Sequence, residues 1–187
     1  KLPNADYTII EHPNGQNDSV EIGLVRDHRF VFYFWFKWWK DTNRELRDST
    51  AKAPSLITID WHRDLLAPCE SEKQDLINLN LTSYKEVALF SWDKLNQLND
   101  GHILAAAYLN LISDIYVLCK QDGTEDENFI DHWGNEHKIR CFDSKENLLN
   151  ELLQNNINEI YFDIDLDYFT ESNDSCGGGE DLVLMDD

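Results

Sequence analysis

Two short acidic segments carry the residues of this chain that are best suited to chemistry. They read D-W-H-R-D at residues 60–64 and D-I-D-L-D at residues 163–167. Each follows an apolar stretch that is typical of a buried strand: residues 55–59, opened by Pro54, precede the first segment, and residues 158–162 precede the second. Carboxylates together with an imidazole, placed where strands end, predict the two halves of a dinuclear metal site.

The spacing within both segments favours a common face. Side chains alternate between the two faces of an extended chain, so every second residue projects to the same side if that geometry continues past the strand end. The residues grouped in this way are Asp60, His62 and Asp64 in the first segment and Asp163, Asp165 and Asp167 in the second. Unpaired carboxylates held close together repel one another and raise their own pKa values, and a divalent cation removes that cost. Metal binding would therefore explain why acids gather here.

A simpler interpretation competes with this metal site, and a calcium loop is a further alternative for the second segment. In a chain with 36 acidic residues, one D-x-H-x-D pattern is also what a solvated loop can contain. The second segment resembles a calcium loop only superficially, because Ile164 and Leu166 are apolar and no glycine occupies the sixth position. The pairing of two oxygen-rich segments, one with an imidazole, favours the metal site.

The ligand types indicate which metal to expect. Oxygen ligands with one or two histidines favour Mn²⁺ ahead of Fe²⁺ or Zn²⁺ when no thiolate takes part. The four cysteines are widely spaced and form no C-x-x-C pair. We therefore expect them to be reduced and mostly buried, without a disulfide framework or a zinc knuckle.

Composition indicates one folded domain. The chain has 187 residues, 42% apolar and 12% aromatic, so we expect a single domain over residues 1–187, complete or as a portion of a longer chain. Its formal charge of −20 argues against nucleic acid as a partner and would favour a cationic substrate or peptide, unless the acidity serves only solubility. No apolar run reaches the roughly 20 residues that span a bilayer, and no signal sequence opens the chain. We therefore expect no membrane association and a cytoplasmic protein.

The elements expected around the two segments alternate between strands and helices. Besides the strands before the acidic segments, apolar runs predict strands at 19–25, 85–90, 113–118 and 138–142. The predicted helices cover the aromatic run 30–39, residues 103–111 with Asp100 near the N-cap, and residues from the cap Ser144 to about 153. For the aromatic run a strand is the alternative to a helix, because periodicity does not decide between the two. Its side chains are expected to pack in the core, with one wall of a substrate pocket as the alternative. This alternation predicts an α/β fold with a largely parallel sheet, in which ligands gather at the carboxyl ends of the strands.

At these positions the chain resembles the arginase and deacetylase superfamily. D-x-H-x-D after one strand, D-x-D after a later strand and an isolated upstream histidine, His28, are similar to the metal-binding pattern of that superfamily, whose members are three-layer α/β/α proteins. The form found here, with Asp27-His28 before an aromatic run and Y-F-D-I-D-L-D-Y-F at residues 161–169, is similar to the peptide arginases. Those enzymes convert arginine side chains of ribosomally made precursor peptides to ornithine. The resemblance spans roughly residues 20–170.

The resemblance implies two Mn²⁺ ions with shared and separate ligands. The implied ligands are Asp60 and Asp163 as bridges, His28 and Asp64 for one ion, and His62 and Asp165 for the other. Paired cations lower the pKa of water, and hydroxide would then attack the guanidinium carbon to give urea and the ornithine amine. Asp167 is expected to orient a ligand rather than to bind metal.

A general acid must protonate the leaving nitrogen, and we select His102, at a predicted helix start, ahead of His132 and His137.

The chain also departs from the arginase pattern. Free-arginine arginases carry Gly-Gly-Asp-His before the first metal histidine, where this chain has Val25-Arg26-Asp27-His28, and they use a later glutamate to hold the guanidinium. Glu171 and Glu180 lie too close to the second segment to be equivalents of that guanidinium-binding glutamate.

The expected partner is an arginine-containing precursor peptide. Two other functions stay open. One is a metal-dependent phosphatase, because D-x-H and D-x-D also occur in phosphoryl chemistry. The other is a non-catalytic, metal-stabilised binder of basic peptides.

Overall fold

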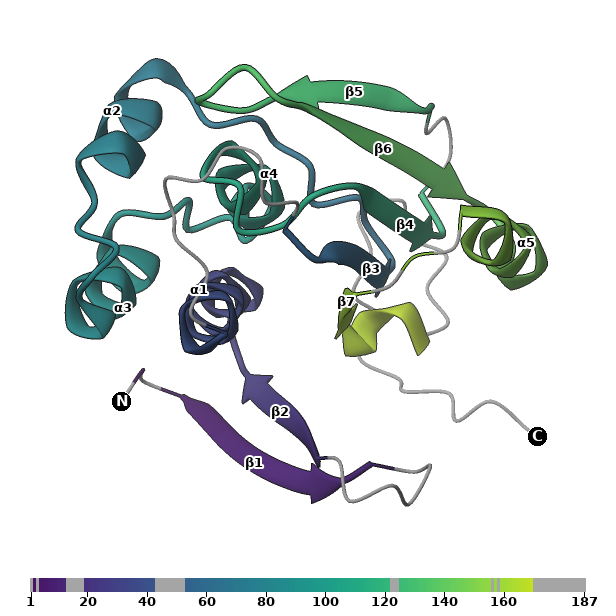
Figure 1. Ribbon diagram of the computed structural model, residues 1–187, viewed down its shortest axis with the longest axis horizontal. Coiled ribbons are helices and arrows are strands. Elements are labelled where there is room, and N and C mark those ends of the chain that lie inside the picture. The colour runs from purple at the N-terminus through teal and green to yellow at the C-terminus, as the bar shows by residue number, and fades with distance from the viewer. Residues whose placement is uncertain are drawn as a thin grey trace.

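A five-stranded sheet in the order β5-β6-β4-β3-β7 forms the centre of the molecule (Figure 1). The computed structural model describes residues 2, 4–12, 19–42, 53–121, 125–155, 157 and 159–169. The parallel strands are β3 (Ser55–Asp60), β4 (Ile115–Cys119), β6 (Glu136–Phe142) and β7 (Ile160–Ile164). Strand β5 (Glu127–Ile130) runs antiparallel to β6 at one edge. The prediction of an α/β fold with a mostly parallel sheet is confirmed.

Helices pack on both faces of this sheet, which is why the central strands β3 and β4 are buried over almost their whole length. Helices α1 (Val31–Asp41) and α4 (His102–Tyr108) pack against one face, where Leu56 and Val117 point. Helix α5 (Lys145–Asn155) covers the other face and brings Leu148 to Ile57 and Leu118. Helices α2 (Glu70–Asn78) and α3 (Tyr84–Asp93) complete the larger core beside α1 and α4 (Figure 1).

The aromatic run forms α1, as the sequence predicts. Phe32, Trp35, Phe36 and Trp39 recur at helical spacing and are buried in the main core, so the expectation of core packing is confirmed. Phe34 is buried on another side of the same helix. Helix α1 needs apolar side chains on both sides because it lies between the sheet and a separate two-stranded ribbon (Figure 1).

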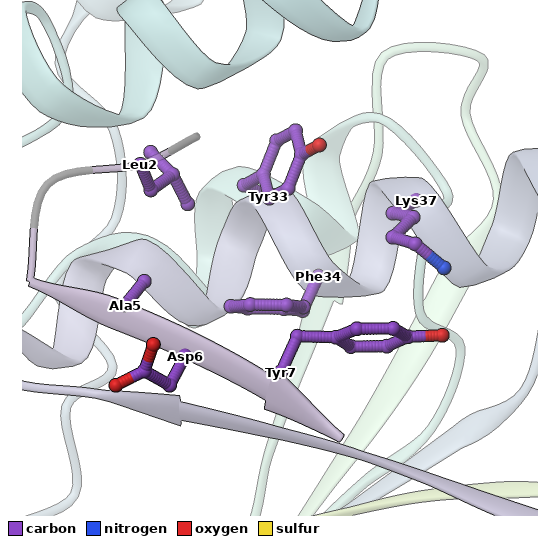
Figure 2. Close-up of a pocket in the computed structure, with 7 residues that line it drawn as sticks. All are labelled: Leu2, Ala5, Asp6, Tyr7, Tyr33, Phe34 and Lys37. Carbon is purple, nitrogen blue, oxygen red and sulfur yellow. The ribbon is translucent and has the colours of Figure 1, made fainter. Parts of the chain in front are cut away.

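That ribbon consists of β1 (Ala5–Glu11) and β2 (Ser19–Val25), which pair antiparallel. Strand β2 was predicted and β1 was not. The ribbon lies so close to α1 at Gly23 that a Cβ there would be 2.9 Å from the ring of Phe34. An open cavity of about 170 Å³ between ribbon and helix is lined by Leu2, Ala5, Asp6, Tyr7, Tyr33, Phe34 and Lys37 (Figure 2). The predicted site residues are not among these lining residues.

Some expected elements were wrong. Residues 85–90 belong to helix α3 rather than to a strand, because the Ser83 side chain caps the Glu86 amide at 3.2 Å and starts a helix there. Helix α4 has Gly101 at its N-cap, so Asp100 lies next to the cap as expected, and the Asp100 carboxylate accepts a hydrogen bond from Asn96 at 2.8 Å. Helix α2 and strand β5 were not predicted. The strands near 113–118 and 138–142 and the helix after Ser144 are confirmed with small shifts at their ends.

Cys69, Cys119 and Cys141 form no disulfide with one another, and they differ in burial. Cys119 is buried and Cys141 is half-buried, as expected, but Cys69 is exposed. Cys176 lies outside the described residues, as do Glu171 and Glu180. Among the helices of the described ranges, none is long and apolar enough to cross a membrane.

Candidate metal centre

The two acidic segments meet at the carboxyl ends of neighbouring parallel strands. Strands β3 and β7 pair with Thr58 opposite Asp163, and the Thr58 hydroxyl donates to Oδ2 of Asp163 at 3.4 Å. Asp60 ends β3 on the same face as Thr58 and Leu56, which is the face that α1 and α4 cover. Asp60 and Asp163 are both buried. This is the edge at which parallel sheets bind ligands.

Beyond the strands, turns bring the other acids inward, so the expected extended alternation does not continue. Strand β3 ends at Asp60, the His62 amide donates to Oδ1 of Asp60 at 2.8 Å, and Asp64 adopts a left-handed backbone with φ 50°. The Trp61 amide donates to Oδ1 of Asp167 at 3.1 Å and so joins the two segments. Backbone amides that donate to carboxylates therefore hold the group together.

His28 lies among the acids of both segments. It begins the short 3-10 turn η1 (His28–Phe30) between β2 and α1. Its Nε2 is 2.8 Å from Oδ2 of Asp163, and its Nδ1 is 2.9 Å from Oδ2 of Asp64. The same Nδ1 lies 3.2 Å from Asp165 and 3.4 Å from Asp60. The upstream histidine selected from the sequence is therefore in contact with four of the predicted metal ligands.

His62 lies at the solvent side of this group. Its Nδ1 is 3.3 Å from Oδ2 of Asp167 and 3.8 Å from Oδ1 of Asp60. The side chains of His62 and Asp167 are 34% and 26% exposed, whereas that of Asp60 is 2% exposed. The resemblance implied Asp165 beside His62 and Asp167 outside the ligand set. In the structure Asp165 contacts His28, and Asp167 contacts His62.

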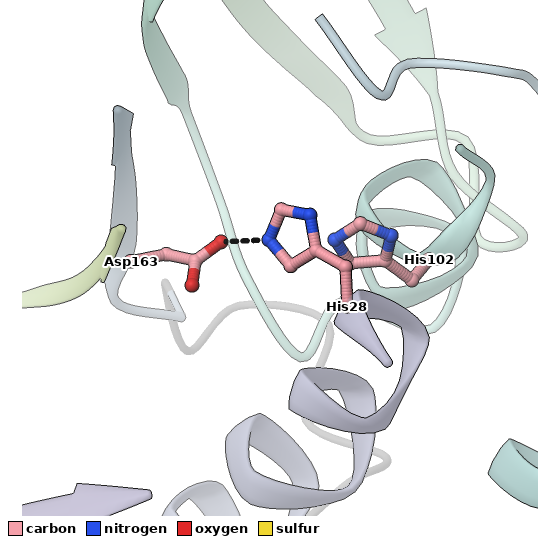
Figure 3. A group of neighbouring side chains, drawn as sticks. All are labelled: His28, His102 and Asp163. Carbon is pink, nitrogen blue, oxygen red and sulfur yellow. Dashed lines mark hydrogen bonds and ion pairs between the residues drawn. The ribbon is translucent and has the colours of Figure 1, made fainter. Parts of the chain in front are cut away.

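His102 reaches the group from α4. It is fully buried, and its ring centroid is 4.3 Å from that of His28 (Figure 3). Trp35 stacks on the same ring at 5.7 Å. Within the described part of the chain, neither ring nitrogen of His102 has a hydrogen-bond partner. Leaving a buried polar group unsatisfied costs about 1–3 kcal/mol. We use the name acid–histidine cluster for eight side chains: His28, His62, His102, Asp60, Asp64, Asp163, Asp165 and Asp167.

Burial and like charges shift the pKa values in the acid–histidine cluster. Burial, followed by the charge of Asp64, raises the pKa of Asp60 to about 8, and burial with the charge of Asp165 raises that of Asp167. Burial alone would lower the pKa of His28, but its hydrogen bonds to Asp163 and Asp64 raise it well above its ordinary value. The cluster thus retains protons that a bound cation would displace.

His102 titrates in the opposite sense. Burial, followed by the charge of His28, lowers the pKa of His102 well below its ordinary value. The backbone of Asn99 opposes this shift. His102 is therefore a neutral imidazole at physiological pH.

The acid–histidine cluster has the composition and spacing of a metal site. The groups of described residues whose ligand atoms lie within 4.8 Å of one another are His28–Asp60–Asp64, Asp60–His62–Asp167 and His28–His102–Asp163. The first two share Asp60, whose carboxylate has two oxygens with which to bridge two cations. Its Oδ2 is buried and accepts no hydrogen bond from the described residues, which is the state of an oxygen suited to a cation. Imidazoles with carboxylates suit Mn²⁺, Fe²⁺ or Zn²⁺.

The loop before α4 joins the parts of the cluster that come from different segments. Oδ1 of Asn99 accepts a hydrogen bond from the Arg29 amide at 3.3 Å, next to His28. The carbonyl of Asp100 accepts one from the Leu66 amide at 2.8 Å, just after the first acidic segment. Asn99 has a left-handed backbone with φ 62°. Sequence reasoning did not identify this role, although Asn-Asp-Gly before a helix was the turn signal that could have indicated it.

Two histidines that the sequence placed in a polar stretch are engaged elsewhere. His137 is buried, with Nδ1 donating to the carbonyl of Ser113 at 3.0 Å and Nε2 3.4 Å from Asp131. His132 is exposed and its ring contacts Tyr108. Neither belongs to the three candidate metal groups of the described residues.

Comparison with known proteins adds no relative. No protein-family model matches the chain, and no curated protein matches it.

Proposed function

We propose that this chain is a dinuclear metal-dependent hydrolase that converts arginine side chains of a precursor peptide to ornithine and releases urea. The observation that carries this proposal is the sharing of Asp60 by two groups, each with one histidine and a second carboxylate, at the carboxyl end of β3. A carboxylate shared by two such groups can bridge paired metal ions, and paired ions are used by many hydrolases.

The acidic residues of the cluster include buried ones, Asp60 and Asp163, and partly exposed ones, Asp165 and Asp167. The residues that would hold the ions are His28, Asp60, Asp64 and Asp163 for one and Asp60, His62 and Asp167 for the other. When bound, divalent cations such as Mn²⁺ lower the pKa of water, so that hydroxide is available near neutral pH. The side chains of Asp165 and Asp167 are 32% and 26% exposed, so a guanidinium that approaches from solvent would meet these two carboxylates first.

The reaction adds water to the guanidinium carbon, breaks the bond to the side-chain nitrogen and transfers a proton to that nitrogen. His102 was predicted as the proton donor. Because His102 has no exposed surface, this role requires the leaving nitrogen to reach the buried side of the cluster.

The choice of arginine as substrate rests on the sequence. The segments at 60–64 and 161–169 resemble those of peptide arginases, and a formal charge of −20 favours encounter with a cationic peptide. The three-layer arrangement expected of the superfamily agrees with helices on both faces of the sheet.

A urea assay on the full chain loaded with Mn²⁺ tests the proposal. The substrates are an arginine-containing peptide, the same peptide with lysine in place of arginine, and free arginine. We expect urea from the arginine peptide and none from the lysine peptide. Chelation and the Asp163→Asn variant should both abolish the signal, whereas Asp93→Asn, which changes an exposed acid of α3, should retain it.

Two other results would replace the proposal. Phosphate release from p-nitrophenyl phosphate without urea from any peptide would identify a phosphatase. Metal-dependent binding of the arginine peptide with neither product would identify a non-catalytic binder.

A further inference from the structure

We infer that His102 is itself a metal ligand and forms, with His28 and Asp163, a nitrogen-rich position in the metal site. This inference rests on the proposed function in one respect, which is that the acid–histidine cluster binds metal. It differs from the sequence prediction, in which His102 donates a proton.

The first observation is geometric. His102 begins α4, His28 begins η1 and Asp163 lies in β7, yet one ligand atom from each lies within 4.8 Å of the others. Figure 3 shows the two imidazole rings side by side, with His28 turned toward the Asp163 carboxylate. Three potential ligands from separate elements therefore converge on one volume.

The second observation is independent of that convergence and concerns the polar atoms of His102. A buried polar nitrogen ordinarily has a partner, and even His137, whose Nε2 lacks hydrogen-bond geometry, donates Nδ1 to the carbonyl of Ser113 and has Nε2 3.4 Å from Asp131. His102 is fully buried, and neither of its nitrogens has a hydrogen-bond partner among the described residues. A cation at this position would supply the partner that the ring lacks.

The surroundings of His102 suit a ligand whose orientation is fixed. Trp35 stacks on the ring with an interplanar angle of 21°, which restricts its rotation. A metal-bound imidazole commonly directs its second nitrogen at a backbone carbonyl, and the backbone of Asn99 raises the pKa of His102 as such a group does.

A ligand role for His102 changes the expected metal preference. With His28, His62 and His102 the cluster offers three imidazoles instead of the one or two considered from the sequence. Nitrogen ligands favour metals late in the series from Mn²⁺ to Zn²⁺ more strongly than oxygen ligands do. The loss of His102 should therefore weaken Co²⁺ binding more than Mn²⁺ binding.

Titration of the full chain with Co²⁺, followed by its visible absorption, tests the inference without any assay of activity. The variant His102→Phe keeps a planar ring against Trp35 and removes both nitrogens. We expect it to bind Co²⁺ at least about tenfold more weakly than the wild type, with a smaller change for Mn²⁺. The exposed residue His132 provides the matched control, and His132→Phe should bind both metals as the wild type does.

X-ray absorption of the Co²⁺-loaded wild type counts imidazole ligands directly and does not depend on the variant folding. A wild-type count of three imidazoles, which His28 and His62 alone cannot provide, supports the inference, and a count of two overturns it. An unchanged count and unchanged Co²⁺ affinity in His102→Phe overturn it. If His102→Phe keeps its metal content but loses one limb of the pH profile of urea release, the inference is also overturned, and His102 is instead the proton donor. A wild type that binds no Co²⁺ or Mn²⁺ contradicts the proposed function as well.

Discussion

At the residue scale, Asp60 connects the two halves of the candidate metal centre. It belongs to two of the three metal groups, and its amide contact with His62 and its ion pair with His28 reach both sides of the cluster. Because the pKa of Asp60 is raised to about 8, this side chain is mostly protonated near neutral pH without metal. An uncharged amide of the same shape should then replace it without harm to the metal-free fold.

Asp60→Asn should therefore separate metal binding from folding. We expect the metal-free variant to unfold at the same temperature as the wild type or higher, since one buried acid is gone. The rise in Tm on addition of Mn²⁺ should disappear, because an amide cannot bridge two cations as a carboxylate does. Thermal unfolding by circular dichroism measures both, with Asp93→Asn as the control. A full Mn²⁺-induced rise in Asp60→Asn would show that the cluster is not the metal site.

Asp165 and Asp167 are distinguished by which histidine they contact. The structure places Asp167 at 3.3 Å from His62, whereas Asp165 lies 3.2 Å from His28. Asp167→Asn should remove one of the two bound ions, because the group around His62 then loses a carboxylate. Asp165→Asn should retain both ions at lower affinity. Metal content after dialysis, measured by mass spectrometry, tests this, and the reverse result would favour the ligand set implied by the resemblance.

At the scale of elements, the loop before α4 determines how η1 and α4 approach each other. Asn99 holds a left-handed conformation at φ 62° and accepts a hydrogen bond from Arg29, the residue after His28. Its substitution should therefore act on stability and on the metal site together.

Asn99→Ala should lower the free energy of unfolding by about 1–2 kcal/mol, the cost of a left-handed conformation for a residue with a Cβ and no local polar group. It should also weaken Mn²⁺ binding, because His28 and His102 are no longer held together. Asn110 has a similar backbone, with φ 50°, and is not part of the metal groups of the described residues. Asn110→Ala should therefore lose stability and keep its metal affinity. Urea denaturation and Mn²⁺ titration of both variants test the prediction, and equal loss of affinity in both would contradict it.

The elements also show what sequence could and could not provide. Strands β3 and β7 were predictable because apolar, β-branched runs end in acids, and α1 was predictable from its aromatic run. Helix α3 was mistaken for a strand because its apolar run is short and the Ser83 cap was overlooked. The contact of His28 with Asp163 joins residues 135 positions apart, and it depends on β7 lying next to β3 in the sheet. No local sequence pattern encodes this strand order. Nor does one encode the turns that place Asp165 beside His28 and Asp167 beside His62.

At the scale of the whole molecule, the metal centre joins segments from most of the chain. Its residues come from the β2–α1 junction, the end of β3, the start of α4 and the end of β7 (Figure 1). An unfolded chain cannot hold these groups together, so a cation bound by them stabilises only the native state. Global stability is therefore a readout of the site, and its dependence on pH can be derived from the cluster.

The Mn²⁺-induced rise in Tm should be larger at pH 8 than at pH 6.5 at a fixed Mn²⁺ concentration. In the unfolded chain, aspartate loses its proton near pH 4 and histidine near about 6.5. In the metal-free native protein the pKa of Asp60 is about 8 and that of His28 is well above its ordinary value, so the native state binds more protons across this window. The contribution of both groups to stability therefore falls as the pH rises. His102 has a lowered pKa and is neutral in the native state, so its unfolded form, half protonated near about pH 6.5, adds only a small opposing slope at the low end of this window. A cation must displace the protons of Asp60 and His28, and that displacement becomes easier as the pH rises.

Thermal unfolding with Mn²⁺ and with chelator at both pH values measures the difference, and an equal or larger rise at pH 6.5 would contradict proton-coupled metal binding at this cluster.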